Sequence, residues 1–386
     1  METFDLAIIG GSISGLSLAY WLRDSDLRIA IFEEDKNIGF PLKCSGIVSE
    51  RILDIFPELP KNIIEKRIGL ARIFCENKDI ELEVNALILN RPKLENWLFK
   101  KLEKKGIIFI WDRAERFYIR ENLILRGLER GGAPFQGAGK DFPQDRKIAI
   151  KTKSKEYYLS KYIAGCDGCA SITRRFFVDE NPKRFYFAKF CYAKGKMPKE
   201  LQVFLDRDYS EFFAWKFPRK KYIEYGLATK NRLYDKFERF IQSKNAQIEE
   251  VYGGTIPIGP TKSYFKYGLL IGDACAQTKP LTGGGIIYSL IASQIASEII
   301  KKKNPNFKEY EKKWKKILGK EIRYQMLIRR MLEKMNNKNI VKLLTDIEKL
   351  SIENIKDYDF PITANLSNIS KLTLAKLFLK YFRFLF

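Results

Sequence analysis

The chain has 386 residues and carries 70 lysines and arginines against 47 acids, which gives a formal net charge of +23. This length exceeds what one hydrophobic core usually holds, so we expect two or more domains. Histidine is absent from the sequence, which excludes a histidine metal cluster and a histidine-dependent catalytic triad, and we expect no metal site.

The cysteines and the apolar runs indicate where the protein works. Six cysteines at irregular spacing do not read as a disulfide framework in a chain this long, which favours a reducing, cytoplasmic setting. Glu2 and Asp5 stand where a signal peptide would carry positive charge. Because no run of about twenty apolar residues occurs, we expect no helix that spans a membrane.

The first 34 residues carry the strongest local pattern. We expect a strand over 4–9, a glycine turn over 10–15, a helix over 16–23 and a second strand over 27–32. With Glu33 after the second strand, this order is the dinucleotide-binding fingerprint in its required context. Gly10 would make the turn, Gly15 would let helix and strand pack closely, and Ser12 replaces the glycine nearest the pyrophosphate. The alternative is a βαβ unit that binds no nucleotide.

The next stretches add a loop, a clamp and an insertion. Residues 37–50 form a loop rich in small residues, which we expect to run back across a cofactor. Arg91 precedes Pro92 at the start of a helix, and it is either a solvated side chain or a clamp on phosphate or ribose. Glycines and prolines near 126–145 indicate a flexible surface insertion between two strands, 118–125 and 147–151, that pair as a hairpin.

Residues 185–229 indicate strands of a second sheet that is dense in aromatic side chains, among them Phe213, Trp215 and Phe217. Such strands are most often plain core. The functional alternative is an apolar tunnel for a substrate.

The stretch 269–290 indicates the second half of a cofactor site. A short strand ends at Gly272-Asp273, which leaves a carboxylate at its carboxyl end, and a run of three glycines leads to Gly285 and a helix that begins at Ile286. A helix amino terminus preceded by glycines offers N–H groups to an anion and lets a flat ring approach the backbone. The alternative is an ordinary glycine-rich turn.

Beyond residue 300 the chain becomes basic and its pattern helical, with 21 basic and 9 acidic residues over 301–386. At its end Lys376, Lys380 and Arg383 share one helical face, and leucines and phenylalanines fill the remainder. A basic amphipathic helix is typical of a membrane interface. The alternative is a terminal helix docked on the body of the protein.

Together these motifs resemble the geranylgeranyl reductase family of flavoproteins, within the larger group of FAD enzymes of the para-hydroxybenzoate hydroxylase type. The matching pieces are Gly10 to Gly15 with Glu33, residues 39–46 (Gly-Phe-Pro-Leu-Lys-Cys-Ser-Gly), Asn90-Arg91, residues 165–168 (Gly-Cys-Asp-Gly), residues 253–257 (Gly-Gly-Thr-Ile-Pro), Gly272-Asp273-Ala274 and residues 280–286 (Pro-Leu-Thr-Gly-Gly-Gly-Ile).

The resemblance implies an α/β (α+β) protein with a Rossmann-like FAD-binding domain, an inserted antiparallel-sheet substrate domain and a C-terminal helical region. The implied boundaries are 1–180 and 253–300 for the two parts of the FAD-binding domain, 181–252 for the substrate sheet and 301–386 for the basic helical region.

The resemblance also implies a role for each matching residue toward FAD. The pyrophosphate would lie at the turn from Gly10 through Ser12 to Ser14 and Gly15. At the adenosine end, Glu33 would bind the ribose, Arg91 the ribose-phosphate, and Ala114 would lie beside the adenine. At the other end, Cys44, Ser45 and Ile47 would line the flavin, Asp273 would bind ribityl or pyrophosphate oxygens, and Gly285 and Ile286 would bind the flavin N1 and C2 carbonyl. Phe213, Trp215 and Phe217 would line the substrate, although the family has a tyrosine at the place of Phe213.

The implied activity is FAD-dependent saturation of C=C bonds in geranylgeranyl chains of archaeal-type membrane lipids or their precursors. A hydride would come from the flavin N5, and Cys44 is the first hypothesis for the proton donor. Alternatives are a monooxygenase or halogenase on the same fold and a flavin electron carrier without a lipid substrate.

The partners follow from charge and from the single dinucleotide fingerprint. Expected partners are an isoprenoid lipid, a membrane surface and an acidic electron donor such as ferredoxin, with a reduced deazaflavin or a nicotinamide as alternatives. We expect a cytoplasmic protein that is peripherally associated with the membrane. Because no recognised RNA or DNA motif accompanies the charge, we expect no nucleic-acid binding.

Overall fold

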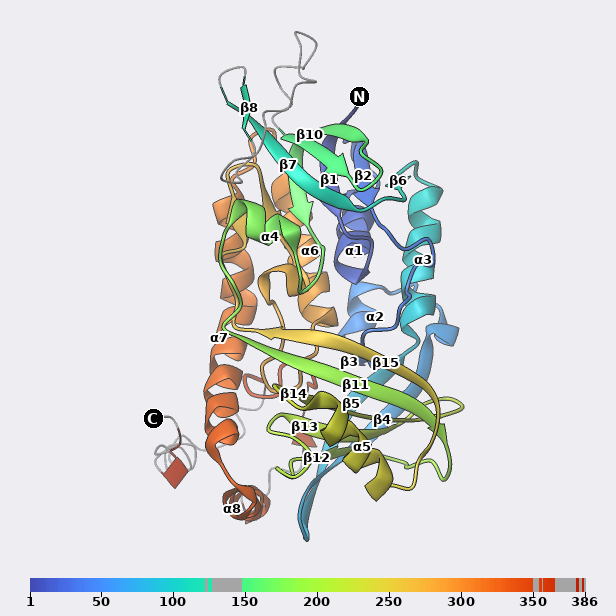
Figure 1. The fold of residues 1–386 in the computed structure, drawn as a ribbon, viewed down its shortest axis with the longest axis vertical. Helices are drawn as coiled ribbons and strands as arrows, with labels where there is room; N and C mark the ends of the chain where they lie inside the picture. Colours follow the sequence, from blue (N-terminus) through green and yellow to red (C-terminus); the bar gives the residue numbers. More distant parts are fainter. Residues whose placement is uncertain are drawn as a thin grey trace.

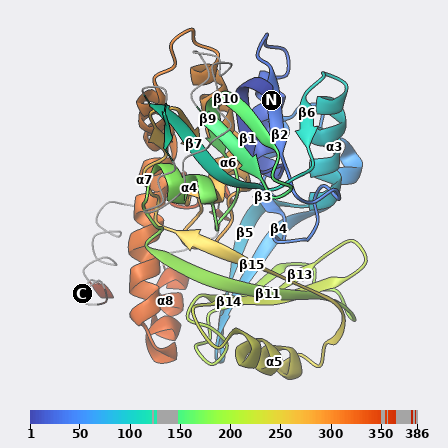
Figure 2. The same ribbon diagram turned by 45° about the horizontal axis from the view of Figure 1, so that its top comes forward.

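The computed structural model describes residues 1–121, 124–126, 148–349, 354–355, 357–364, 380–381 and 384. In this part of the chain two sheets lie one beyond the other, and one long helix, α7 (Phe307–Lys334), runs along the side of both (Figure 1). The view turned by 45° shows the same arrangement, with helix α5 (Leu233–Ser243) at the far end of the second sheet (Figure 2).

The first sheet has strand order β6-β2-β1-β10-β9-β7-β8, with β17 beside β10 and β16 beside β17. At its centre β1 pairs in parallel with β2 and with β10. Its strands are β1 (Glu2–Ile9), β2 (Ile29–Phe32), β6 (Ile108–Ile110), β7 (Ala114–Glu121), β8 (Ile124–Arg126), β9 (Ile148–Thr152), β10 (Tyr157–Gly165), β16 (Tyr264–Phe265) and β17 (Gly268–Leu270). Three central strands that run in parallel are typical of a doubly wound nucleotide-binding sheet.

The second sheet has strand order β15-β11-β14-β13-β12-β4-β5-β18, and β3 pairs with β5. Most of its pairs are antiparallel, whereas β12 with β4 and β18 with β5 are parallel. Its strands are β3 (Ile47–Ser49), β4 (Ile64–Cys75), β5 (Lys78–Leu89), β11 (Arg184–Lys194), β12 (Leu201–Phe204), β13 (Phe213–Pro218), β14 (Ile223–Thr229), β15 (Gln247–Ile258) and β18 (Asn354–Ile355).

Helices cover the sheets and join them. α1 packs against α3 and α6, and α6 packs against α7. Besides α5 and α7, the helices are α1 (Ile13–Leu22), α2 (Arg51–Ile55), α3 (Arg91–Glu103), α4 (Ile172–Phe177), α6 (Ile286–Ile300) and α8 (Asn337–Lys349), with short 3-10 turns η1 (Lys61–Ile63) and η2 (Gly272–Cys275). The predicted fold class, a Rossmann-like sheet with an antiparallel sheet and a helical C-terminal part, is confirmed by this arrangement.

The sheets divide the chain differently from the boundaries expected from the sequence. Strands β3, β4 and β5 lie within residues 1–180 yet belong to the second sheet, and β15 crosses the expected boundary after residue 252. The reason is strand pairing: β4 receives β12 as a parallel neighbour, so the early hairpin extends the second sheet. Strand order is a long-range property that a local pattern does not encode.

The structure also bears on the predicted hairpin, the predicted insertion and the absence of a membrane-spanning helix. The expected hairpin exists, because β7 pairs antiparallel with β9 (Tyr118 opposite Ala149), but β7 begins at Ala114 and ends at Glu121. The insertion expected near 126–145 lies, after its first residue, outside the described residues, as do Lys376 and Arg383 of the expected amphipathic helix. In the described residues no helix is both long and apolar enough to cross a membrane.

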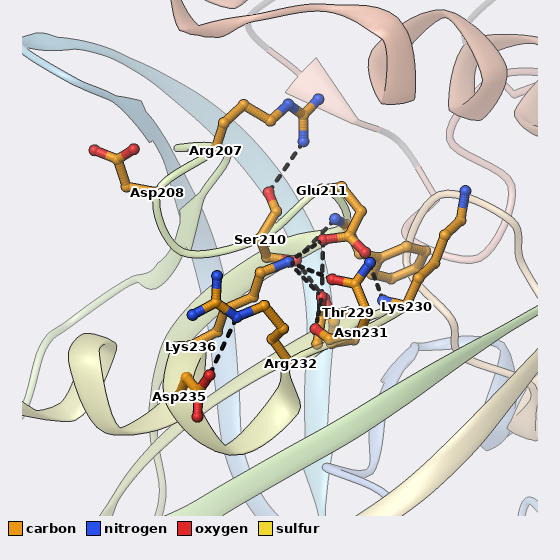
Figure 3. A network of polar contacts seen from close by, with 12 residues as sticks. Arg207, Asp208, Ser210, Glu211, Thr229, Lys230, Asn231, Arg232, Asp235 and Lys236 are labelled. Atoms are coloured by element: carbon orange, nitrogen blue, oxygen red, sulfur yellow. Dashed lines mark hydrogen bonds and ion pairs between the residues drawn. The ribbon is translucent and has the colours of Figure 1, made fainter.

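A polar network holds the second sheet to α5 (Figure 3). The carboxylate of Glu211 accepts hydrogen bonds from the Thr229 hydroxyl at 2.8 Å and from the Lys230 backbone N–H at 2.5 Å, and it pairs with the Lys236 ammonium at 2.6 Å. Burial raises the pKa of Glu211, but these donors outweigh it and lower the pKa to about 2. The network therefore contributes to stability at neutral pH.

Candidate functional site

The first turn of α1 can be formed only by small residues. Gly10 has φ +100°, and a Cβ atom placed on it would lie 2.4 Å from the Cys166 carbonyl oxygen. A Cβ atom on Gly15 would lie 2.0 Å from the Gly10 carbonyl oxygen. Ser12 is the exposed N-cap residue, and its side chain makes no capping hydrogen bond. The predicted glycine turn thus packs α1 directly against the end of β1.

This turn leaves backbone donors free. The Ile13 N–H donates to Glu95 Oε1 at 3.1 Å, and the first bond within the helix runs from Leu16 N to the Ser12 carbonyl at 2.9 Å. Among the described residues, the N–H groups of Ser14 and Gly15 have no acceptor. Free N–H groups at a helix amino terminus bind anions such as phosphate.

Glu33 stands at the carboxyl end of β2, beside the same turn. Its Oε2 accepts from the Gly11 N–H at 2.7 Å and its Oε1 from the Asp35 N–H at 2.9 Å. Burial raises the pKa of the Glu33 carboxyl, and these backbone donors only partly offset the effect. The carboxylate is therefore held in a fixed orientation next to the helix terminus, where a ribose hydroxyl of a nucleotide would lie.

η2 brings the second half of the predicted site against the first. Gly272 has φ +67°, and a Cβ atom on it would lie 2.4 Å from the Ser14 hydroxyl oxygen and 2.7 Å from that of Ser289. The next residue, Asp273, is half-buried, and its carboxylate has no hydrogen-bond or ion-pair partner in the described part of the chain. Burial raises the pKa of Asp273 to about 6, although the positive charge of Arg91 lowers it.

The glycine loop before α6 ends next to this carboxylate. Gly285 is the N-cap of α6, and a Cβ atom on it would lie 3.4 Å from Asp273 Oδ1. The first bond of α6 runs from the Ser289 N–H to the Gly285 carbonyl at 2.8 Å. Ile286 therefore begins a helix whose first N–H groups face the region of Asp273, and the predicted start of this helix at Ile286 is confirmed.

Thr282 in the glycine loop adds a second unpartnered group. Its hydroxyl oxygen is buried and has no hydrogen-bond partner among the described residues. The loop itself is tight, because the Lys279 N–H donates to the Gly284 carbonyl and the Gly283 N–H donates to the Lys279 carbonyl, both at 2.8 Å. A rigid loop that presents a buried, unpaired hydroxyl is a place where a ligand can supply the missing bond.

Arg91 lies beneath the loop that carries Cys44. The guanidinium pairs with Glu95 one turn along α3, and its Nε is buried without a partner among the residues described. Burial lowers the pKa of Arg91, but the negative charge of Glu95 and the hydrogen bonds to Glu95 and Cys44 outweigh it and raise the pKa. Cys44 Sγ also accepts from the Gly46 N–H at 3.4 Å. The Arg91 side chain is 12% exposed and lies beside the Cys44 thiol, so it is not a solvated side chain.

Ser45 connects this loop to the second sheet. Its hydroxyl donates to Glu224 Oε1, which also accepts from Trp215 Nε1 at 2.9 Å, and its carbonyl accepts from Arg219. Glu224 is fully buried, and burial raises its pKa although Arg219 pulls it down. Arg219 also pairs with Glu65 at 2.9 Å. The network therefore fixes the backbone of the loop that carries Cys44 against the second sheet.

The three predicted substrate residues are all buried in one strand. Phe213, Trp215 and Phe217 lie in β13, with ring centroids 5.6 Å apart for the first pair and 5.9 Å for the second. They pack in the same apolar cluster as Ile47. Ala114, which is expected beside the adenine, packs in a different cluster, on the first sheet with Phe4 and Phe32.

Several polar residues of the site were not predicted from the sequence. Glu95 follows Arg91 by four residues, a spacing that places both on one helix face and would have indicated the pair. Glu224 lies in β14 and Arg219 in the turn between β13 and β14, and no spacing along the chain connects either residue with Ser45. Lys279 pairs with Asp359 at 2.6 Å across 80 residues, which no local pattern reveals.

The residues present fit the FAD that the resemblance implies. Two free N–H groups of α1, the unpartnered Asp273 carboxylate, Arg91 Nε and the Thr282 hydroxyl lie around one place at the carboxyl end of the first sheet. Such unpaired groups cost free energy unless a ligand binds them. The donors suit a pyrophosphate, and the acceptors suit ribose or ribityl hydroxyls.

Comparison with curated proteins supports the resemblance. An uncharacterized protein of Methanocaldococcus jannaschii is 29% identical over 378 residues, which cover 92% of this chain and 90% of the relative. Digeranylgeranylglycerophospholipid reductase 2 of Methanothermobacter thermautotrophicus is 25% identical over 418 residues, covering 98% of this chain and 97% of the relative. No family model matches the chain.

Solved structures share the fold. A geranylgeranyl bacteriochlorophyll reductase-like protein from Thermoplasma acidophilum has a TM-score of 0.78 at 19% identity and covers 100% of this chain and 98% of its own. The flavin-dependent brominase Bmp2 has a TM-score of 0.59 at 13% identity, over 89% of this chain and 93% of its own. The chain thus resembles the geranylgeranyl reductases over nearly its whole length, as its motifs predict, and has the fold of flavin-dependent enzymes.

Proposed function

We propose that this protein is an FAD-dependent reductase that saturates C=C bonds in the geranylgeranyl chains of archaeal-type membrane lipids or their precursors. One observation carries the proposal: the amino termini of α1 and α6 and the unpartnered Asp273 carboxylate meet at one place, where Gly272 leaves no room for a side chain and the backbone of Gly285 lies against Asp273. The two relatives that bear a reductase name cover 98% and 87% of this chain and suggest the substrate class.

The residues that would hold FAD follow from their positions. The free N–H groups of Ser14 and Gly15 suit the pyrophosphate, Glu33 the adenosine ribose, and Asp273 the ribityl or pyrophosphate oxygens. Arg91 would bind the ribose-phosphate through its free Nε. When bound, FAD supplies a hydride to the alkene.

The rest of the chain excludes water and orients the substrate. Cys44, Ser45 and Ile47 lie on one loop and strand, with the Ser45 hydroxyl tied to Glu224, so this wall is rigid. Phe213, Trp215 and Phe217 give the second sheet an apolar layer suited to an isoprenoid chain. Gly285 and Ile286 would place the amino terminus of α6 where negative charge develops during the reaction.

The positive charge suggests how substrate and electrons arrive. A quarter of the chain, 301–386, carries a surplus of 12 positive charges. Such a field attracts an anionic membrane surface and an acidic electron donor such as a ferredoxin. We include both partners in the proposal, and a reduced deazaflavin or a nicotinamide are alternatives for the donor.

The decisive experiment is anaerobic. The purified protein is reduced with dithionite, mixed with a geranylgeranylated glycerophospholipid, and the lipid is weighed by mass spectrometry. We expect mass gains in steps of two hydrogens together with reoxidation of the flavin. Bound flavin with unchanged lipid would contradict the proposal. Oxygen-dependent hydroxylation or halogenation would then indicate an oxygenase, and flavin reduction by an acidic partner alone would indicate an electron carrier.

Cys44 is the proton donor that the sequence indicates, and it can be tested in the same assay. If the thiol delivers the proton, Cys44→Ala should lower the single-turnover rate by about 100-fold, the lower end of what a positioned acid contributes. Cys75→Ala is a matched control, because Cys75 is buried in the second sheet away from the flavin-side loop. Full turnover by Cys44→Ala would show that another group is the donor.

A further inference from the structure

Four residues near the end of the described chain, Asp357 to Phe360, return to the candidate site. Asp359 Oδ1 pairs with Lys279 Nζ at 2.6 Å, and both side chains are at most 2% exposed. Asp359 Oδ2 accepts from the Ser49 N–H at 2.6 Å, and the Asp359 carbonyl accepts from the Tyr288 hydroxyl at 3.2 Å. The segment is therefore tied at once to β3, to the glycine loop and to α6.

Asp357 anchors the other side of the segment. Its carboxylate pairs with Arg51 in α2 and accepts from the backbone N–H groups of Asp359 at 2.8 Å and Phe360 at 3.2 Å. The Phe360 ring lies 5.6 Å from that of Tyr288, centroid to centroid. Tyr358, between two anchored aspartates, has little freedom to move.

Tyr358 faces the residues that surround the proposed flavin. Its ring centroid lies 4.1 Å from Lys279 Nζ. Burial raises the pKa of Tyr358, the Lys279 ammonium lowers it and the Asp359 carboxylate raises it, and Tyr358 lies close enough to Cys44 and Thr282 to interact with both side chains. The backbone of Lys279 closes the glycine loop, so the phenol stands beside the loop that leads into α6.

We propose that Tyr358, in place of Cys44, is the proton donor of this site, with Lys279 and Asp359 as its positioning residues; the inference rests on the proposed reduction of an alkene. When bound, FAD would supply the hydride for one carbon of the alkene as its π bond breaks, and Tyr358 Oη would give the proton to the other carbon. The phenolate left behind would have the Lys279 ammonium over its ring and would recover a proton from water.

Tyr358 has a cation in place for the charge that proton transfer would leave behind. The Lys279 ammonium lies over the Tyr358 ring and stabilises the phenolate that forms when Tyr358 gives its proton away. Asp359 fixes that ammonium through an ion pair of 2.6 Å.

The test compares Tyr358→Phe with Cys44→Ala and with Tyr234→Phe, a control on a tyrosine that is 67% exposed on α5. For each protein we would measure the FAD dissociation constant, the single-turnover rate of alkene reduction after dithionite reduction, and the alkaline titration of the spectrum of bound oxidised FAD. Tyr358→Phe should bind FAD within about twofold of the wild type and reduce the lipid about 100-fold more slowly.

The spectral titration reports on Tyr358 without any turnover. Ionisation of a phenol beside the flavin should give a transition above the usual pKa of tyrosine, present in the wild type and in Cys44→Ala and absent from Tyr358→Phe. An unchanged rate in Tyr358→Phe would overturn the assignment and leave the proposed function standing. A rate loss matched by loss of FAD affinity would overturn it too, because Tyr358 would then serve binding. A wild type that binds FAD and reduces no alkene would overturn both proposals.

Discussion

The candidate site and the network around Glu211 are both rich in polar groups, but they differ in how these groups are partnered. Around Glu211 the carboxylate receives three donors, and Arg207 donates to the carbonyls of Ser210, Leu332 and Met335. At the candidate site the Asp273 carboxylate and the Thr282 hydroxyl have no partner in the described chain.

The polar groups around Glu211 bond to one another and stabilise the fold, whereas we propose that the unpartnered groups of the candidate site bind a ligand. A buried polar group without a partner destabilises the folded state by about 1–3 kcal/mol, so a folded chain retains it only where another interaction offsets this loss. The network around Glu211 lowers the pKa of its carboxyl, whereas the pKa of the Asp273 carboxyl is raised. We therefore expect substitutions at the two places to change stability in opposite directions.

The largest effect should come from filling the glycine turn. Gly15→Ala places a Cβ atom 2.0 Å from the Gly10 carbonyl oxygen, so α1 must move away from the turn. We expect FAD binding to weaken by about 100-fold or more, equivalent to about 2.7 kcal/mol. Gly69→Ala is the control, because a Cβ atom on Gly69 meets nothing within 4 Å. Equal FAD affinity in both variants, measured by fluorescence titration, would contradict the proposed site.

Asp273→Asn should weaken FAD binding and yet stabilise the protein without FAD. The folded-state pKa is raised to about 6 from an ordinary 3.8, so the charged carboxylate costs stability at pH 7. As pH falls through about 6 the wild type binds a proton and gains stability, and below about 3.8 the advantage of Asp273→Asn should vanish. Urea unfolding at several pH values measures this, and a variant less stable than the wild type at pH 7 would contradict the expectation.

Glu211→Gln should show the opposite sign and a smaller effect. The folded-state pKa is lowered to about 2 from an ordinary 4.5, so the ionised carboxylate stabilises the protein above pH 4.5 and loses this contribution as pH falls toward 2. We expect a loss of about 2 kcal/mol at pH 7, after allowance for partial exposure, and unchanged FAD affinity. A loss of FAD affinity in this variant would remove the distinction between the two regions.

Part of this site could be predicted because its signals are local. The turn from Gly10 to Gly15, the acid after β2 and the glycines before α6 are short patterns in which each residue serves the backbone at its own position. The helix that begins at Ile286 and the aromatic strands of the second sheet follow from residue spacing in the same way. The C-terminal helices α7 and α8 also agree with the helical pattern seen in the sequence.

The sequence by itself therefore determined the first βαβ unit with its glycine turn, the presence of a second sheet and the place of the glycine loop, because strand, turn and helix formation depend on neighbours in the chain. Only the tertiary structure decided that β4 and β5 join the second sheet, that Ser45 is tied to Glu224, and that Tyr358 returns to Lys279. These contacts join residues about 80 to 180 positions apart, and the packing of whole sheets and helices selects them, which leaves no periodic trace in the sequence.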